Sequence, residues 1–520
     1  MQSSHDTQDS ADPGLHTLRR TGSLVERTAK GTFWLVFWRF ANRGLGVVST
    51  LILVRLLTPA DFGVVSIAMN FVLTLHTLGE FGIEGAIIRD DRPDRSLYDT
   101  GFTILFVRAL VVALVVAIVA YPVGQFLHNP HFLSVALAAA AFSAISAFEN
   151  IGVVDFRRFM VFEKEFVLKL IPRLVSFCTG IILAFILRNF WALIIAIVAN
   201  ELVRVWLTYS MHPYRPKLTL RAWHRIASYS TFSWLGGIVG VVQSTSTNLL
   251  VGRFLGAGAV GILGIGHEIA SLPSDELVMP MARVLFSGFV EIKNSRTESA
   301  RMLLGLLGVT ALVTIPAGLG LSLVADPVVR LAFGTKWLQA IPVVQIGGIA
   351  AGLGCLSTIS ATVFGVQGWM KAGFKVSLAV AIPQIVLLLV LVPRFGLVGA
   401  VLAGAVPGVA GALVRLVVAA KRLSIGPITV LKHVWRSIVG SVIMAAVLVE
   451  LGLGWTGSAA PPGILAARLA GAILIGAAVY IVAVVGFWFM SGMPEGAESN
   501  VLTLLRRGLS RRRYVGSSDS

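Results

Sequence analysis

The sequence is poor in charged residues and in the short motifs of enzymes. Only 13% of its 520 residues are charged, which is too few to cover the surface of a soluble chain of this length. It contains no GxxxxGK[ST] phosphate loop, no HExxH and no paired-cysteine metal spacing. The sequence therefore predicts no ATPase domain, no cofactor, no metal and no enzyme. Any energy for transport would come from an ion gradient, the membrane potential or removal of the substrate.

Cysteine and a secretory leader are also lacking. The two cysteines, Cys178 and Cys355, both fall in apolar stretches, so we expect no structural disulfide. The first 30 residues are polar and contain no apolar core, which argues against a cleavable signal peptide. They are expected to be disordered, and the first apolar stretch would serve as the insertion signal.

Long apolar stretches fill most of the remaining chain. Mean hydropathy is +0.83 and 56% of the residues are hydrophobic. A membrane-spanning helix needs roughly 20 mostly apolar residues. The sequence therefore predicts an all-α polytopic membrane protein with about fourteen transmembrane helices. The predicted spans are 33–54, 62–83, 101–124, 131–152, 166–187, 190–210, 226–250, 259–281, 301–324, 339–366, 372–392, 396–419, 434–452 and 464–490.

The net charge of +17 is distributed unevenly over the connecting segments. With the N-terminus inside, the inner segments carry 28 Lys and Arg residues and the outer loops carry 6. This contrast follows the positive-inside rule and predicts both termini in the cytoplasm. Topology and anionic lipid therefore explain the basic charge better than nucleic acid does.

A short motif recurs in the two halves of the chain. Arg55–Gly63 and Arg253–Gly261 each follow one apolar stretch, precede another and place Gly eight residues after Arg. Two later loops also correspond in order, which indicates a duplicated six-helix unit followed by two extra helices. The predicted divisions are a cytoplasmic N-terminus (1–30), an N-terminal lobe (31–211), a cytoplasmic linker (212–225), a C-terminal lobe (226–422), two additional helices (423–492) and a basic cytoplasmic tail (493–520).

Seven segments carry a resemblance to a known family: Arg55–Gly63, Gly79–Arg89, Trp191–Leu193, Gly252–Gly256, Ala270–Pro273, Ile315–Gly318 and Phe333–Trp337. Over roughly residues 30–420 the chain resembles the Wzx-type polysaccharide flippases, the polysaccharide-transport branch of the multidrug/oligosaccharidyl-lipid/polysaccharide exporter superfamily. Two positions depart from the pattern, because Thr247 stands where relatives usually have Asp and Leu263 where they often have Tyr. The first departure speaks against a cation site built on that aspartate.

The resemblance implies two six-helix lobes, related by pseudo-two-fold symmetry, around a central cavity that opens alternately to each side. The implied substrate is an undecaprenyl-diphosphate-linked oligosaccharide, moved across the bacterial inner membrane for surface polysaccharide synthesis. The implied partners are this glycan and membrane lipids, with a polymerase and a chain-length regulator as candidates.

Charged residues inside the first two predicted spans are the candidate substrate site. Arg39 and Arg43 lie four apart and share one helix face. A cationic face inside a cavity suits a diphosphate, because guanidinium pairs with phosphate oxygens bidentately. Arg173 and Glu80 complete this predicted set. The alternative is that the arginines snorkel to the inner interface, or pair with Glu80 to hold the lobe together.

A second group of titratable residues lies in the eighth predicted span. Glu268 and Asp275 are seven apart on one helix face, with His267 and Glu276 beside them. One hypothesis is a proton- or cation-coupling site, since intramembrane carboxylates can titrate in the working range. The other, slightly favoured, is that Pro273 breaks the helix and places the acids in the inner vestibule.

Arg204 and Arg415 occupy similar places near the inner ends of the two halves. For both, a solvated or lipid-phosphate-facing role is expected rather than substrate binding.

Two other functions compete with the flippase. One is a cation-coupled small-molecule exporter of the multidrug branch, which an acidic, aromatic cavity would favour. The other is a membrane enzyme such as an O-antigen ligase or a polymerase, which would need a large periplasmic domain. The predicted outer loops are all short, so the flippase is the preferred reading.

Overall fold

The structure is a computed structural model that describes residues 24–78, 83–90, 93–159, 161–223, 231–291, 295–457 and 460–493. Inside the helices, it does not describe the side chains of 24–33, 35–36, 77–78, 85–86, 89, 231–234, 275–291 and 355. Throughout these described ranges the backbone forms helices joined by turns and short extended segments.

Helices of membrane-spanning length dominate the fold. By length and composition, nine helices in the described part of the chain could cross a membrane, or ten if one bent pair counts as a single span. One of the nine is a helical hairpin, and α1, α10 and α11 occupy further predicted spans. A helix therefore lies at each of the fourteen predicted places, and the predicted all-α polytopic membrane fold is confirmed.

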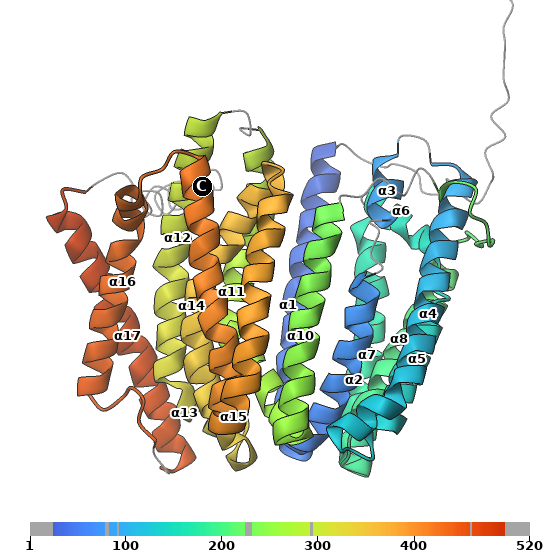
Figure 1. Ribbon diagram of the computed structural model, residues 1–520, viewed down its shortest axis with the longest axis horizontal. Coiled ribbons are helices and arrows are strands. Elements are labelled where there is room, and N and C mark those ends of the chain that lie inside the picture. Colours follow the sequence, from blue (N-terminus) through green and yellow to red (C-terminus); the bar gives the residue numbers. More distant parts are fainter. Residues whose placement is uncertain are drawn as a thin grey trace, which may run out of the picture. The chain divides into compact units, whose positions relative to one another are not determined.

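The chain forms two compact units, an N-terminal unit of Met1–Trp234 with Gly256–Gly258 and a C-terminal unit of Leu235–Leu255 with Ala259–Ser520. Figure 1 shows the helices of the N-terminal unit in blue to green. They are α1 (Leu24–Leu56), α2 (Pro59–Leu78), α3 (Ile83–Arg89), α4 (Arg95–Leu127), α5 (Phe132–Ser146), η1 (Ile151–Val153), α6 (Val154–Arg158), α7 (Phe162–Leu187) and α8 (Trp191–Met211).

The long helices of the N-terminal unit alternate in direction, so its connections gather at two ends. We call the end where α4 and α7 begin and α8 ends the basic end; α3 and α6 lie there (Figure 1). The opposite end carries tight turns. Thr58 and Asp61 cap the start of α2, since the Thr58 hydroxyl donates to the Asp61 carboxylate over 2.6 Å. His128 and Arg188 end α4 and α7 in the left-handed conformation, with φ of 51° and 49°.

The fourth predicted span is not one straight helix, contrary to the prediction for 131–152. After Ser146 the chain turns and continues as η1 and α6, whose direction differs by 69° from that of α5. Asn150 stabilises the break: its side chain accepts a hydrogen bond from the Gly152 amide at 2.9 Å and donates to the Tyr214 carbonyl at 2.7 Å.

The C-terminal unit contains the second set of long helices. They are α10 (Thr231–Leu255), α11 (Ala257–Glu291), α12 (Arg296–Leu323), α13 (Ala325–Ala332), η2 (Thr335–Ala340), α14 (Ile341–Val366), α15 (Met370–Arg422), α16 (Pro427–Glu450) and α17 (Pro462–Met490). The backbone of α15 reverses at Gly396, whose φ is 58°. Its two halves therefore form the hairpin predicted around Pro393–Leu397, with a left-handed residue as in the α7–α8 turn at Arg188.

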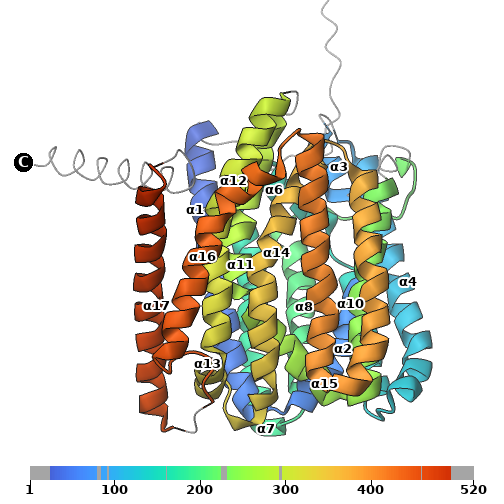
Figure 2. The ribbon, with the colours of Figure 1, turned by 60° about the vertical axis from the view of Figure 1, so that its left-hand side comes forward.

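Small residues let the helices of this unit approach closely. A Cβ atom added at Gly318 of α12 would lie 2.8 Å from the Cα of Gly352 in α14. The two additional helices belong to the same packing, because Met444 and Leu448 of α16 lie in one buried cluster with Leu323 of α12. Figures 1 and 2 show α17 at the edge of the unit, beside α16.

Candidate substrate and ion sites

Helices α1 and α7 pack side by side and run in the same direction. Near the basic end, Trp34, Phe37 and Trp38 of α1 surround Phe166 of α7, with ring centroids 4.7, 5.4 and 6.3 Å apart. Towards the other end, Leu53 and Leu57 of α1 share a buried cluster with Ala184 of α7. Trp34 and Trp38 thus pack against a neighbouring helix.

Between these two apolar contacts lies the predicted arginine group. A Cβ atom at Gly46 would be 3.5 Å from Nη2 of Arg173, so the Arg173 side chain reaches across to α1. Arg39, Arg43 and Gly46 follow at helical spacing on one face, which is therefore the face turned to α7. All three arginines are half-buried. Arg173 thus lies beside α1 at Gly46, and Arg39 and Arg43 precede Gly46 on the same face over about 10 Å of helix, a region that we call the α1–α7 seam.

This α1–α7 seam lies well inside the length of the helices. Arg43 precedes Arg55, the last basic residue of α1, by twelve residues, which corresponds to about 18 Å of helix. Arg173 precedes Arg188 by fifteen residues, or about 22 Å. The fourth member of the predicted set, Glu80, lies outside the described residues, so its pairing with an arginine stays a prediction.

The second predicted group lies on α11, which is continuous from Ala257 to Glu291. Pro273 therefore does not break this helix, and that prediction was wrong. A proline costs a helix one hydrogen bond, but packing against a neighbouring membrane helix can compensate for it. Next to it, the Ser274 hydroxyl donates to the Ala351 carbonyl of α14 over 2.8 Å.

One face of α11 packs on α14, and the predicted acids are on another. Gly266 is in close contact with Val343, and a Cβ at Gly347 would lie 2.9 Å from Ala270. Glu268 is two residues from the packed positions and points away from them; it and His267 are both exposed. Asp275 follows Glu268 by seven residues and therefore belongs to the same face of α11. The side chains of Asp275 and Glu276 are outside the described residues.

A neutral polar cluster joins α10 to the first half of α15. The Gln243 amide donates to the Gln384 oxygen over 2.8 Å, and the Gln384 amide donates to Thr247 Oγ1 over 3.1 Å. Thr247 in turn donates to the Gln243 carbonyl at 3.0 Å. Thr247, the position where relatives usually have Asp, is thus part of a hydrogen-bonded group without formal charge.

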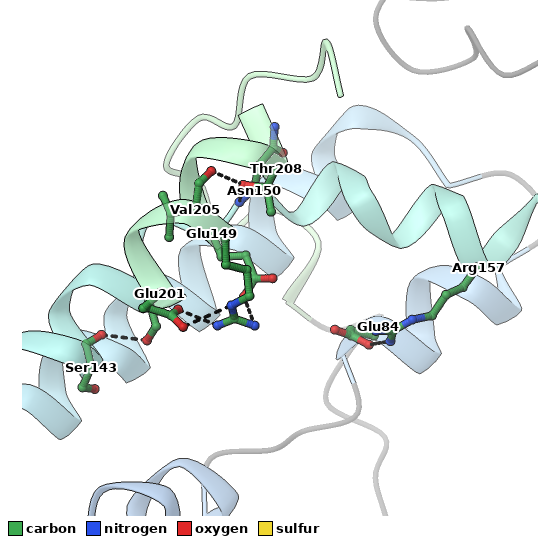
Figure 3. Close-up of polar contacts among 10 residues, drawn as sticks. Glu84, Ser143, Glu149, Asn150, Arg157, Glu201, Val205 and Thr208 are labelled. Atoms are coloured by element: carbon green, nitrogen blue, oxygen red, sulfur yellow. Dashed lines mark hydrogen bonds and ion pairs between the residues drawn. The ribbon is translucent and has the colours of Figure 1, made fainter. Parts of the chain in front are cut away.

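An ion triad in the N-terminal unit was not predicted as a unit. Arg204 of α8 binds the Glu201 carboxylate through Nε at 3.1 Å and Nη2 at 2.5 Å, and its Nη1 lies 3.1 Å from Glu149. Figure 3 shows Glu201 on α8 and Glu149 in the turn between α5 and η1. The Glu201 side chain is only 2% exposed. The spacing of Glu201 and Arg204 inside one span could have indicated their pairing, but Glu149 could not be placed from sequence.

A second chain of ion pairs lies at the basic end. Arg157 of α6 contacts Glu84 of α3 (Figure 3) and binds Glu165 of α7 through Nε at 2.9 Å. Glu165 also accepts from Lys169 at 2.6 Å. Glu84 thus ties the short helix α3 to α6.

The predicted linker is bound to the N-terminal unit as a strap, which we define as residues 212–222. Asp155 of α6, 1% exposed, accepts from the Tyr98 hydroxyl and lies 3.4 Å from His212 Nε2. The Tyr214 amide donates to His212 Nδ1 over 3.2 Å, so the ring hydrogen of neutral His212 sits on Nε2 and faces Asp155.

Helix α4 holds the rest of the strap through three polar side chains. Asp99 accepts from the Tyr214 hydroxyl at 2.5 Å and from the Lys217 amide at 2.8 Å. Thr100 and Thr103 accept from backbone amides of the strap at 3.1 and 2.8 Å. Burial and the bond to Asp99 raise the pKa of the Tyr214 phenol, so it stays a donor.

Arg415, in the second half of α15, has a different environment from Arg204. It donates through Nη1 to Ser357 of α14, while its buried Nε has no hydrogen-bond partner. A solvated or lipid-phosphate-facing role was expected for both arginines; Arg204 is instead held by two carboxylates, and for Arg415 the expectation stays a prediction.

Residues 52–342 match the family model described as "Polysaccharide biosynthesis protein". The chain belongs to this family. The predicted resemblance to the polysaccharide-transport branch is thereby confirmed. Of the residues above, Arg173, Arg204, Glu268 and Thr247 lie within the matched part, whereas Arg39, Arg43 and Arg415 lie outside it.

Two curated relatives carry related descriptions. The "Lipopolysaccharide biosynthesis protein WzxC" of Escherichia coli (strain K12) is 28% identical over 334 residues, which cover 62% of this chain and 67% of that protein. The "Succinoglycan biosynthesis transport protein ExoT" of Rhizobium meliloti (strain 1021) is 24% identical over 323 residues, covering 62% of this chain and 65% of that protein. This chain thus matches about two thirds of each relative's length.

The fold is also similar to that of a solved structure. The lipid II flippase MurJ in an inward closed conformation superimposes with a TM-score of 0.66 at 16% identity, covering 87% of this chain and 99% of that chain. At this identity the likeness establishes the fold and leaves the substrate of this chain open.

Proposed function

We propose that this family member is a flippase that moves an undecaprenyl-diphosphate-linked oligosaccharide across the bacterial inner membrane by alternating access. The two curated relatives described as polysaccharide biosynthesis proteins support the substrate class. Both termini would lie in the cytoplasm, in keeping with the distribution of basic residues along the chain.

The observation that carries the proposal is the α1–α7 seam. Arg39, Arg43 and Arg173 place three cationic groups within about 10 Å along two parallel helices, deep in the predicted membrane region. Cations at such depth are costly unless they meet an anion or water. A diphosphate offers several oxygens at a spacing that two guanidinium groups can bind together. The glycan would cross with the head group while the polyprenyl chain stays in lipid.

The test combines a genetic and a chemical measurement. A strain lacking the gene should accumulate lipid-linked repeat units in the cytoplasmic leaflet and lose the surface polysaccharide. The double variant Arg39→Gln, Arg43→Gln should restore at least tenfold less polysaccharide than the wild type, because each lost charge-assisted bond contributes about 1.5–3 kcal/mol. Arg188→Gln, at an exposed turn of the same unit, is the matched control and should restore it fully. An intact surface polysaccharide without the gene contradicts the proposal.

One observation favours the rival, a cation-coupled small-molecule exporter. Glu268 presents an exposed carboxylate from the middle of a predicted span, on a face of α11 that does not pack on α14. In that case Glu268→Gln should abolish export of a cationic dye driven by an ion gradient. Under the flippase proposal the same variant binds the lipid-linked substrate as the wild type does, which a binding titration measures.

A further inference from the structure

Arg415 lies in the middle of a packed helix interface. It follows Ala412 by three residues and precedes Ala419 by four, and both alanines are buried against α14. Its partner Ser357 is likewise flanked by Leu356 and Ile359, which belong to the same two apolar clusters. A guanidinium is therefore inserted between two apolar contacts, at the seam of α14 and α15.

Among the described residues, no acid contacts this cation. In the described part of the chain its only polar partner is the hydroxyl of Ser357, which carries no charge. Nε is buried and makes no hydrogen bond. Guanidinium has five N–H donors in a fork, so most of its binding capacity is unused. A cation within a membrane helix normally pairs with an acid, a backbone carbonyl or an anionic ligand.

Arg415 lies near the end of its helix. Arg415 precedes Arg422, the last residue of α15, by seven residues, or about 10 Å of helix. Arg422 stacks on Trp369 at 4.9 Å, a pairing typical of the membrane interface. Arg415 is half-buried, so part of its guanidinium remains accessible.

We propose that Arg415 and Ser357 form a binding site for the phosphate group of a lipid. Guanidinium and hydroxyl donors are the groups that bind phosphate oxygens, and the low-dielectric seam strengthens such a pair. The phosphate can belong to an anionic membrane lipid or to the diphosphate of a polyprenyl lipid. The site is built from other residues than the α1–α7 seam, and its existence does not depend on the flippase proposal.

The test is a lipid titration of the purified full chain, followed by native mass spectrometry. The two probes are undecaprenyl diphosphate and dioleoyl phosphatidylglycerol, and the probe that binds identifies the source of the phosphate. Arg415→Gln should lower the affinity for at least one probe about tenfold, and Ser357→Ala should lower it twofold to threefold. Arg394→Gln, an exposed arginine near the turn of the same hairpin, is the matched control and should bind as the wild type does.

A structural role makes a different prediction. If Arg415 only ties α15 to α14 through Ser357, then Arg415→Gln lowers the melting temperature and leaves both affinities unchanged. Unchanged affinity for both probes overturns the proposal, whatever the melting temperature does. If affinity and melting temperature both fall, Arg415→Lys decides. Retention of at least a third of the affinity supports a cationic phosphate site, and complete loss overturns it.

Discussion

Arg204 and Arg415 are at matching places in the two units but have different hydrogen-bond and ion-pair partners. Each lies seven residues before the end of the last helix of its hairpin, at Met211 and Arg422. Arg204 contacts two carboxylates, one of them almost fully buried, whereas Arg415 contacts one hydroxyl. The same residue type therefore has a structural environment in one unit and a ligand-binding one in the other.

The difference extends beyond the two arginines. In the N-terminal unit, buried polar groups join segments that are far apart in sequence: Arg204 connects α8 to the α5–η1 turn, Asp155 contacts His212 of the strap and Asp99 binds Tyr214. In the described part of the C-terminal unit, several polar contacts between the long helices involve neutral groups, such as Gln243 with Gln384 and Ser274 with Ala351, and Arg415 meets a hydroxyl. This contrast suggests that the N-terminal unit is the stiffer of the two.

The largest expected effect is the loss of Arg204. Arg204→Gln leaves Glu201 and Glu149 as close, unpaired carboxylates, and breaking such a pair costs about 3–5 kcal/mol when it is fully buried. Because the Arg204 side chain is 34% exposed, we expect the lower end of this range. Reversible unfolding in mixed micelles measures it. Arg415→Gln is the matched control and should leave the free energy of unfolding unchanged or raise it. Equal losses in the free energy of unfolding of both variants would contradict the difference between the two arginine environments.

The strap gives the next largest effect. Asp155→Asn places an amide N–H against the Nε2–H of His212 and leaves a buried donor unsatisfied, which costs about 1–3 kcal/mol. The strap should then be cut by trypsin after Lys217 and Arg221 sooner than in the wild type. Tyr98→Phe, which removes the bond to Asp155 and leaves the contact of Asp155 with His212, should have a smaller effect. A strap that stays protected in Asp155→Asn would show that the contacts from Asp99 suffice.

The helices of both units could be predicted from sequence, whereas the contrast between them could not. Apolar stretches of membrane length locate helices because lipid demands internally bonded backbone, and this holds for every predicted span. The bend after Ser146 escaped prediction because it depends on Asn150 binding Tyr214, a residue from the strap. Pro273 was misjudged because tertiary packing on α14 holds α11 together despite the lost hydrogen bond.

The candidate sites were predicted in part. The pairing of Arg39 with Arg43 follows from helical spacing, but their common seam with Arg173 depends on the parallel packing of α1 and α7. Arg204 and Arg415 look alike in sequence, because each lies in an apolar stretch near a basic segment. Only tertiary contacts show that Glu149 reaches one and that no described acid reaches the other.

A designed counter-charge tests whether the two environments can be exchanged. Ser357→Asp places a carboxylate where Arg415 now meets a hydroxyl, which copies the arrangement around Arg204. The variant should unfold no more easily than the wild type and should lose phosphate binding about tenfold, or about 1.4 kcal/mol. Ser357→Asn, of similar size but neutral, is the control and should keep most of the binding. Undiminished binding in Ser357→Asp would contradict the assignment of Arg415.

The smallest expected effect concerns the neutral cluster of the C-terminal unit. Gln384→Met keeps the size of the side chain but removes its bonds to Gln243 and Thr247, and such bonds between membrane helices contribute about 0.6 kcal/mol each. We therefore expect a loss of about 1 kcal/mol in the same unfolding experiment, well below that of Arg204→Gln. A loss as large as that of Arg204→Gln would show that uncharged contacts hold the C-terminal unit as firmly as ion pairs hold the N-terminal one. The different surroundings of Arg204 and Arg415 would then explain what each arginine binds, but would not indicate that one unit is stiffer than the other.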